Sequence, residues 1–223
     1  MFEQTHHTEL FKEHLLTSLR LGDLPARKSK VCKHCNVYTP GDEGGMVYVV
    51  ESGRIKIVML SPDGKECLIG IHTAGDLFGE SYFGCGHYQE TATAMEDTIL
   101  IRITLSALLQ YVASKQSILS GALQYLARRI ADQQQTILDL MTVNSECRLG
   151  KALLRLGDKL GEKHLSRIRL KHKISHEELS QIVGTTRPRI SEFMNKFREL
   201  GLIELSEAGF IIINRQKLAD YLA

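Results

Sequence analysis

The sequence lacks several features that would place it in a specialised class of protein. Only 4 of its 223 residues are proline, and its composition is globular rather than disordered or collagen-like. No apolar run reaches the ~18 residues that a membrane span needs, so no membrane partner is expected. The first residues, MFEQTHHTELFKEH, lack the basic-then-apolar pattern of a secretory signal, which predicts a cytoplasmic location. The five cysteines are an odd number, which argues against a disulfide scaffold.

The net charge of +2 is also small, but it is unevenly distributed along the chain. From Ser145 to the end, 15 Lys and Arg stand against 10 Asp and Glu, whereas the preceding part has 13 against 16. The C-terminal part is therefore basic, which favours a polyanion as its partner. A solvated surface rich in lysine would give the same numbers. The length of 223 residues suits two domains better than one.

Residues 1–105 are predicted to form a short helix followed by a β domain. An amphipathic pattern covers residues 5–21. Beyond it, three segments rich in β-branched and apolar residues are separated by turn signals such as Ser52-Gly53 and Pro62-Asp63-Gly64; these segments are MVYVVESGRIKIVML, KECLIGIHTAGDLFGE and ETATAMEDTILIRI. Several short strands with regular turns are typical of a sandwich or barrel rather than of βαβ units.

Residues 106–143 change to helical periodicity. Apolar residues recur at steps of three and four, with Gln133 as a polar exception, which is the a/d spacing of a coiled-coil seam. This pattern predicts a dimerisation helix, although an amphipathic helix packed on its own domain would look similar. The seam residues are Leu119, Leu123, Leu126, Ile130, Gln133, Ile137 and Leu140.

Residues 144–223 are predicted to form a second domain that contains a winged helix-turn-helix. Ser175 and Glu178 have the spacing of a capping box, and Gly184 can end the helix that they start. Thr186 is predicted to cap the next helix, with Pro188 in its first turn. Two helices joined by a tight glycine turn are a helix-turn-helix, and the Glu207-Ala208-Gly209 turn supplies a wing.

The second helix of this motif begins with exposed polar residues. In a helix-turn-helix the N-terminal residues of this helix meet base edges in the major groove. Arginine can bind guanine in bidentate fashion, glutamate can accept from cytosine, and lysine suits phosphates. A helical hairpin docked on a protein partner is the alternative interpretation. The predicted DNA-binding residues are Thr186, Arg187, Arg189, Ser191, Glu192 and Lys196.

Three blocks of the sequence together resemble the CRP/FNR superfamily of bacterial transcription regulators. They are TPGDEGGMVYVVESGRIKI, SPDGKECLIGIHTAGDLFGE and ISHEELSQIVGTTRPRISEFMNKFRELGLI, in the order typical of the family. The resemblance implies an α+β chain with an N-terminal β jelly roll of the cyclic-nucleotide-binding type, a long dimerisation helix and a C-terminal winged helix-turn-helix. It also implies a homodimer on a palindromic double-stranded DNA site, with RNA polymerase as a further partner of an activator.

The same resemblance implies an effector pocket in the β domain. Gly79 and Glu80 match the start of the family's nucleotide cassette, in which the glutamate binds the ribose. Ten residues later, Glu90 replaces the arginine that binds the cyclic phosphate, and Thr91 follows in place of a serine. A carboxylate repels a phosphate, so a cyclic nucleotide is not expected as the effector and no cofactor is assigned. Gln133 and Gln134 on the long helix are expected to close the pocket.

Cysteine offers a second kind of sensor. Cys32 and Cys35 have CxxC spacing, which is compatible with a thiol switch or with two metal ligands. On a strand they would point to opposite faces, whereas a turn at Lys33-His34 would let them approach each other. The family's iron–sulfur pattern of several N-terminal cysteines is incomplete here. A redox- or metal-responsive regulator and an effector-independent regulator therefore remain as alternatives.

Enzymatic activity is not expected from this sequence. A cupin-type metalloenzyme would need two or three histidines with a carboxylate on neighbouring strands. His72 and His87 have no HxH partner, and a lone histidine on a strand is usually structural rather than a haem ligand. No metal site, catalytic triad or phosphate-binding loop is predicted.

Overall fold

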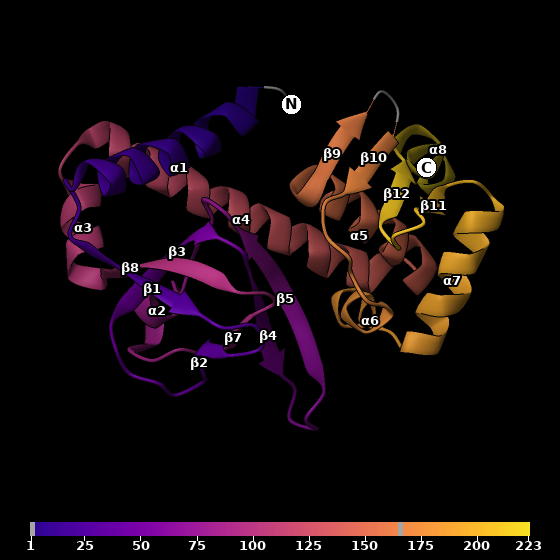
Figure 1. Ribbon diagram of the computed structural model, residues 1–223, viewed down its shortest axis with the longest axis horizontal. Coiled ribbons are helices and arrows are strands. Elements are labelled where there is room, and N and C mark those ends of the chain that lie inside the picture. Colours follow the sequence, from indigo (N-terminus) through magenta and orange to yellow (C-terminus); the bar gives the residue numbers. More distant parts are fainter. Residues whose placement is uncertain (1–2, 165–166) are drawn as a thin grey trace. The chain divides into compact units, whose positions relative to one another are not determined.

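The computed structural model describes residues 3–164 and 167–223 and divides the chain into two compact units, Met1–Gln134 and Gln135–Ala223 (Figure 1). The boundary lies inside the long helix α4 (Gln116–Thr142). The three-part division expected from the sequence treated this helix as a separate piece, whereas the structure assigns its two ends to different units.

The N-terminal unit is a jelly roll of two four-stranded antiparallel sheets, which confirms the fold predicted from the resemblance (Figure 1). One sheet has the order β1-β8-β3-β6, and the other has the order β2-β7-β4-β5. The elements before α4 are α1 (Glu3–Leu21), β1 (Ala26–Val31), β2 (Asn36–Tyr38), β3 (Met46–Ser52), β4 (Arg54–Leu60), β5 (Glu66–Thr73), β6 (Leu77–Phe78), α2 (Tyr82–Cys85), β7 (Thr91–Ala94), β8 (Thr98–Thr104) and α3 (Leu105–Ala113).

Strand β3 separates the two hydrophobic cores of this unit. Successive side chains of a strand point to opposite faces. Val47 and Val49 therefore pack with helix residues of α1, α3 and α4, whereas Tyr48 and Val50 pack inside the jelly roll. The inner core is rich in aromatic rings, and those of Tyr38 and Tyr88 stack with centroids 3.8 Å apart. The interior between the sheets is thus filled by the protein's own side chains.

The helical region expected over 106–143 consists of two helices. The hydroxyl of Thr104 caps α3 by accepting from the amide of Ala107 at 3.2 Å. Helix α3 ends at Ala113, and α4 then continues for 27 residues. Among the described residues, no helix has the combination of length and apolar character that crossing a membrane requires.

Beyond α4, the C-terminal unit combines four helices with a four-stranded sheet of order β11-β12-β10-β9 (Figure 1). Its core packs α5 residues such as Leu149 and Leu153 with Phe197, all with 0% exposure. Strand β10 lies in the basic stretch 166–173, of which Ser166 is outside the described residues. The elements are α5 (Ser145–Leu160), β9 (Gly161–His164), β10 (Arg167–Leu170), α6 (His176–Val183), α7 (Arg187–Glu199), β11 (Ile203–Leu205), β12 (Ile211–Asn214) and α8 (Arg215–Leu222).

Candidate functional site

Helices α6 and α7 form the helix-turn-helix that the sequence predicted. The hydroxyl of Ser175 accepts from the amide of Glu178 at 3.1 Å, and the Glu178 carboxylate accepts from the amide of Ser175 at 2.7 Å. This capping box fixes the start of α6. Gly184 ends the helix with φ +69°, a left-handed conformation that side chains with a Cβ rarely adopt. These local signals are sufficient to set the turn before α7.

The start of α7 differs from the prediction at Thr186. Thr186 occupies the N-cap position, but its hydroxyl accepts no capping hydrogen bond. An N-cap hydroxyl normally accepts from the amide of the second or third helical residue. The second residue of α7 is Pro188, which has no N–H to donate, and the amide of the third residue, Arg189, makes no bond to the Thr186 hydroxyl either. The Thr186 side chain is exposed and is left available to a partner outside the helix.

Helix α7 has a buried face and a charged exposed face. Ile190, Met194 and Phe197 pack into the core of the unit with 0–2% exposure. On the other side, Arg187, Arg189 and Glu192 are exposed, and no ion pair or side-chain hydrogen bond is found for them among the described residues. Three charged groups at the N-terminal end of one helix are therefore free to bind a partner.

Two other residues predicted to contact DNA have partners inside the unit. The hydroxyl of Ser191 lies 2.8 Å from Nδ1 of His176 and donates to the carbonyl of Arg187 at 3.2 Å. The ammonium of Lys196 lies 2.8 Å from the Glu146 carboxylate on α5, which raises the pKa of Lys196. The structure thus uses Ser191 to join α6 to α7, and Lys196 to join α7 to α5, contacts that sequence spacing did not reveal.

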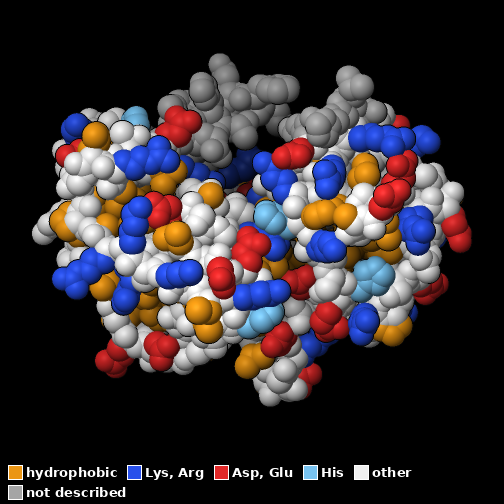
Figure 2. Space-filling view, viewed as in Figure 1, with side chains coloured by type: hydrophobic (Ala, Val, Ile, Leu, Met, Phe, Trp, Pro, Cys, Tyr) orange, Lys and Arg blue, Asp and Glu red, His pale blue; other side chains and the backbone are white. Residues whose placement is uncertain are grey.

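Figure 2 shows how charged side chains are distributed on one face of the molecule. On the face drawn in Figure 2, basic and acidic side chains are interspersed rather than gathered into a single basic patch.

In the N-terminal unit, Gly79 and Glu80 lie directly after β6. Gly79 has φ +89°, and a Cβ there would lie 3.3 Å from the carbonyl oxygen of Met46, so the glycine is required by the turn. Glu80 forms an ion pair with Arg129 of α4. Burial lowers the pKa of Arg129, but the Glu80 carboxylate outweighs that effect and raises it, so the guanidinium is charged. The second oxygen of Glu80, Oε2, is buried and has no hydrogen-bond partner in the described parts of the chain.

Glu90, which the sequence analysis expects in place of the cassette arginine, is buried with 8% exposure and is engaged internally. Its Oε1 accepts from the hydroxyl of Ser81 at 2.7 Å and from the phenol of Tyr38 at 3.0 Å. Burial, and then the neighbouring Glu90 carboxylate, raise the pKa of Tyr38, so the phenol stays protonated and keeps donating. The Glu90 carboxylate is therefore surrounded by hydroxyl donors from Ser81 and Tyr38, and no cation contacts it among the described residues.

The remaining predicted pocket residues are placed differently. Thr91 lies on β7 and pairs with Val58, while Gln133 and Gln134 are exposed on α4. In the described residues, no hydrogen bond links the two glutamines to the cassette. Arg129 makes that link from α4 instead, and the sequence analysis did not identify it. The sequence did offer a signal for Arg129: it is a basic residue one helical turn before Gln133, on the helix expected to close a cassette that carries the additional carboxylate of Glu90.

The predicted seam of α4 is exposed in the single chain. Leu119, Leu123, Leu126 and Ile130 in the N-terminal unit are 42–59% exposed, and Ile137 and Leu140 in the C-terminal unit are 56% and 49% exposed. Apolar residues that remain exposed in one stripe are typical of a surface that another chain covers. The alternative in which the stripe packs on its own domain does not describe these residues.

Cys32 and Cys35 flank a turn, which is the second of the two arrangements considered from the sequence. The amide of Cys35 donates to the carbonyl of Cys32 at 3.0 Å across Lys33-His34. Both cysteines are exposed. His72, by contrast, is buried with its ring 5.7 Å from that of Phe78. In the parts of the chain that the structure describes, no group of three or more His, Cys, Asp or Glu side chains is arranged to hold a metal ion.

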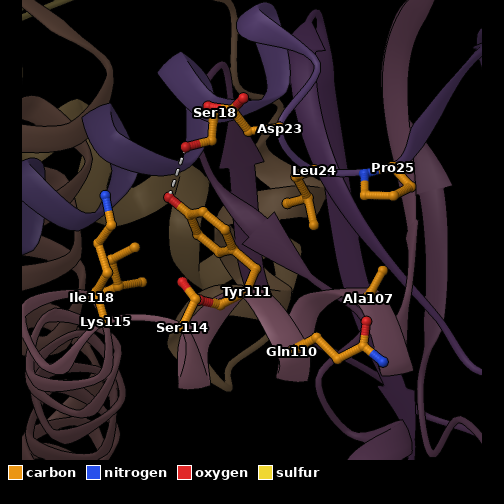
Figure 3. Close-up of a pocket in the computed structure, with 10 residues that line it drawn as sticks. All are labelled: Ser18, Asp23, Leu24, Pro25, Ala107, Gln110, Tyr111, Ser114, Lys115 and Ile118. Atoms are coloured by element: carbon orange, nitrogen blue, oxygen red, sulfur yellow. Dashed lines mark hydrogen bonds between the residues drawn. The ribbon is translucent and has the colours of Figure 1, made fainter.

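A cavity of about 370 Å³ lies in the N-terminal unit, and neither Glu80 nor Glu90 lines it. It is formed by the end of α1, the link to β1, α3 and the start of α4 (Figure 3). The hydroxyl of Tyr111 lies 3.0 Å from that of Ser18 and donates to the carbonyl of His14 at 3.2 Å. This cavity is therefore separate from the cassette.

Two family models match the chain. Residues 28–115 match a cyclic nucleotide-binding domain, and residues 147–221 match a Crp-like helix-turn-helix domain. The chain is 30% identical over 184 residues to the CRP-like cAMP-activated global transcriptional regulator of Mycobacterium tuberculosis, with 82% of each chain covered. It is 25% identical over 201 residues to the fumarate and nitrate reduction regulatory protein of Escherichia coli, which covers 90% of this chain and 80% of that protein.

Among solved structures, a CooA mutant from Carboxydothermus hydrogenoformans is similar, with a TM-score of 0.75 and 26% identity, covering 89% of this chain and 88% of the other. A jelly roll joined through a long helix to a winged helix-turn-helix defines a DNA-binding transcription regulator with an effector-type domain. The chain belongs to the CRP/FNR family of these regulators.

Proposed function

We propose that this protein is a homodimer that reads its DNA site with Thr186, Arg187, Arg189 and Glu192 of α7. The observation that carries the proposal is the group of unpaired, exposed charges at the N-terminal end of the second helix of a helix-turn-helix. That end of the helix meets base edges when the motif binds the major groove. Ser191 and Lys196 hold α7 in place from within the unit.

The chemistry of these side chains suits base recognition. Arg187 and Arg189 can each donate two hydrogen bonds to O6 and N7 of guanine, and Glu192 can accept from N4 of cytosine. A bidentate pair of this kind discriminates against a wrong base by about 1–3 kcal/mol. The unused hydroxyl of Thr186 adds a further donor and acceptor at the helix start.

Dimerisation is proposed to occur through the exposed stripe of α4. Two copies related by a two-fold axis would bury Leu119, Leu123, Leu126 and Ile130 against each other. Two recognition helices then predict a palindromic site with half-sites ~34 Å apart. RNA polymerase is the further partner if the protein activates transcription, in the cytoplasm and without enzymatic activity of its own.

We also propose that the cassette does not take a cyclic nucleotide, although the relative from Mycobacterium tuberculosis is cAMP-activated by name. The free oxygen of Glu80 could still accept a hydroxyl. The phosphate position, however, offers the Glu90 carboxylate, which Tyr38 and Ser81 already occupy as donors. A phosphate placed there would meet like charge, and the Arg129 guanidinium of the cassette is already paired with Glu80.

Selection of binding sites from random DNA duplexes tests the DNA-binding proposal with the full-length protein. The expected result is an enriched palindrome, bound by the dimer in fluorescence anisotropy. Leu123→Asp is expected to sediment as a monomer and to lose this binding. Leu109→Asp, at a similarly exposed leucine of α3 outside the stripe, is the matched control and should remain a dimer. No enriched sequence, or a dimeric Leu123→Asp variant, would contradict the proposal.

A further inference from the structure

The turn between β1 and β2 holds two thiols at the corner where the chain passes from one sheet to the other. Strand β1 pairs with β8 in the first sheet, and β2 pairs with β7 in the second. Cys32 and Cys35 stand at the two ends of the intervening turn. The DNA-binding function proposed above makes no use of this pair.

The geometry of this turn keeps the two cysteines close together. The amide of Cys35 donates to the carbonyl of Cys32 at 3.0 Å, which closes a four-residue turn. The Cα atoms at the ends of such a turn lie less than about 7 Å apart, within the range that disulfides span. His34 supplies the positive φ of +66° and is the one non-glycine residue with positive φ in the described parts of the chain.

Hydrogen bonds to the β7–β8 connection hold the turn in place. The amide of His34 donates to the carbonyl of Ala94 at 2.8 Å, and the amide of Ala94 donates to the carbonyl of Cys35 at 3.0 Å. The amide of Lys33 donates to the Asp97 carboxylate at 3.0 Å. The two cysteines are therefore held at the ends of a turn whose backbone is fixed by these hydrogen bonds.

A thiol reaction fits this site better than a metal does. Structural zinc sites use four protein ligands, and catalytic sites use three. The described chain arranges no three metal-binding side chains together. Both thiols are exposed, as a soluble oxidant requires, and Cys67, Cys85 and Cys147 lie on other elements.

We propose that Cys32 and Cys35 form a reversible disulfide by exchange with a low-molecular-weight disulfide such as oxidised glutathione. The thiolate of one cysteine attacks the small disulfide, releases one glutathione and forms a mixed disulfide. The thiolate of the second cysteine then attacks the protein sulfur of that bond and releases the second glutathione. Two protein thiols are oxidised, one small disulfide is reduced to two thiols, and the two protons pass to the released thiolates.

Intact-mass measurement of the reduced full-length protein after incubation with oxidised glutathione tests the proposal. The expected product has lost two hydrogens, and peptide mapping places the new bond between Cys32 and Cys35. Cys35→Ser is expected to stop at a glutathione adduct on Cys32. Cys85→Ser, which removes another exposed thiol, is the matched control and should form the same disulfide as the unsubstituted protein.

Two outcomes would overturn the disulfide. One is glutathione on both cysteines, and the other is both thiols remaining reduced while Cys85 is modified. DNA binding by the reduced sample is measured in parallel with the selected duplex. If the protein forms the disulfide but binds no specific DNA, only the proposed function is contradicted. If it binds the selected duplex but does not form the disulfide, only the disulfide proposal is contradicted.

Discussion

The cassette of the jelly roll and the start of α7 both carry charged residues where the family binds a ligand, but they use them in opposite ways. In the cassette, Glu80 is paired with Arg129, and Glu90 accepts from two hydroxyls. On α7, Arg187 and Arg189 have no partner in the described chain and extend into solvent. The first site is satisfied mainly from within the protein, whereas the second requires an external partner.

This difference shows how a shared fold separates two functions. Hydrogen bonds to a buried acceptor and the ion pair next to it stabilise the jelly roll, and a ligand that displaced them would lose that stabilisation. Exposed arginines contribute little to folding, so their identity is free to serve recognition. The comparison is tested by variants that remove charge from one site or the other.

The largest effect is expected from Arg187→Ala and Arg189→Ala. Each removes a bidentate contact, so the affinity for the selected duplex should fall by about 1–3 kcal/mol per residue, or roughly five- to 150-fold. Fluorescence anisotropy with the selected and a scrambled duplex measures this loss. Arg215→Ala, whose side chain pairs with Asp158 on α5, is the control and should bind both duplexes like the unsubstituted protein. If all three variants bound the selected duplex with equal affinity, α7 would not be the helix that recognises the DNA sequence.

The next effect concerns two buried carboxylates, one in each unit. Asp139 accepts from Lys151 at 2.7 Å and Arg155 at 3.0 Å, whereas Glu90 has only neutral donors. Asp139→Asn should therefore lower the free energy of unfolding by about 1–3 kcal/mol, because it weakens two charge-assisted bonds. Glu90→Gln keeps an acceptor oxygen and should cost less. Urea unfolding measures the loss of unfolding free energy in each variant. An equal loss in the two variants would contradict the distinction between charged and neutral donors.

The same ion pairs predict a pH dependence. Burial raises the pKa of Asp139, but hydrogen bonds from Lys151, Arg155 and Gln135 outweigh it and hold the pKa below its usual value. A lowered pKa stabilises the fold above the unfolded value of about 4, and this contribution is lost as the pH falls further. The stability difference between the unsubstituted protein and Asp139→Asn should thus shrink below about pH 4. A constant difference down to pH 2 would argue against the ion pairs as its source.

A smaller effect is expected from Lys196→Ala. Because its ammonium is paired with Glu146, its removal should leave the salt dependence of DNA affinity unchanged. A phosphate contact would instead reduce the slope of log affinity against log salt by about 1. Anisotropy titrations at several salt concentrations distinguish the two cases. A reduced slope would indicate that Lys196 contacts a DNA phosphate.

Cyclic AMP should have no effect on the melting temperature. A ligand at ~1,000 times its dissociation constant adds about 4 kcal/mol to the stability of the folded state, which a thermal-shift titration to millimolar concentration readily detects. We expect no saturable shift, because the proposed phosphate position holds the Glu90 carboxylate, which already accepts from Ser81. A saturable shift would show that the cassette still binds the nucleotide.

The elements that sequence reasoning predicted well depend on residues close together in the chain. The capping box of Ser175 and Glu178, the left-handed Gly184 and the turn that ends in Gly209 are all set by neighbours within a few residues. The alternation on β3 likewise follows from period two.

Contacts between distant residues could not be read from the sequence in the same way. Arg129 reaches Glu80 across 49 positions, and Lys196 reaches Glu146 across 50. Spacing placed Gln133 and Gln134 as the closing residues of the pocket, but the direction of each side chain on α4 decides which one faces the jelly roll. Only packing of the helix against β6 makes Arg129 that residue.

The sequence by itself determined the order of the domains and the boundaries of the helix-turn-helix, because caps, turns and residue types act over short distances. Tertiary structure alone decided which charges are already paired, which apolar stripe of α4 stays exposed, and that Cys32 and Cys35 stand at the two ends of a closed turn. Pairing and exposure depend on neighbours that the folded chain brings together from far along the sequence.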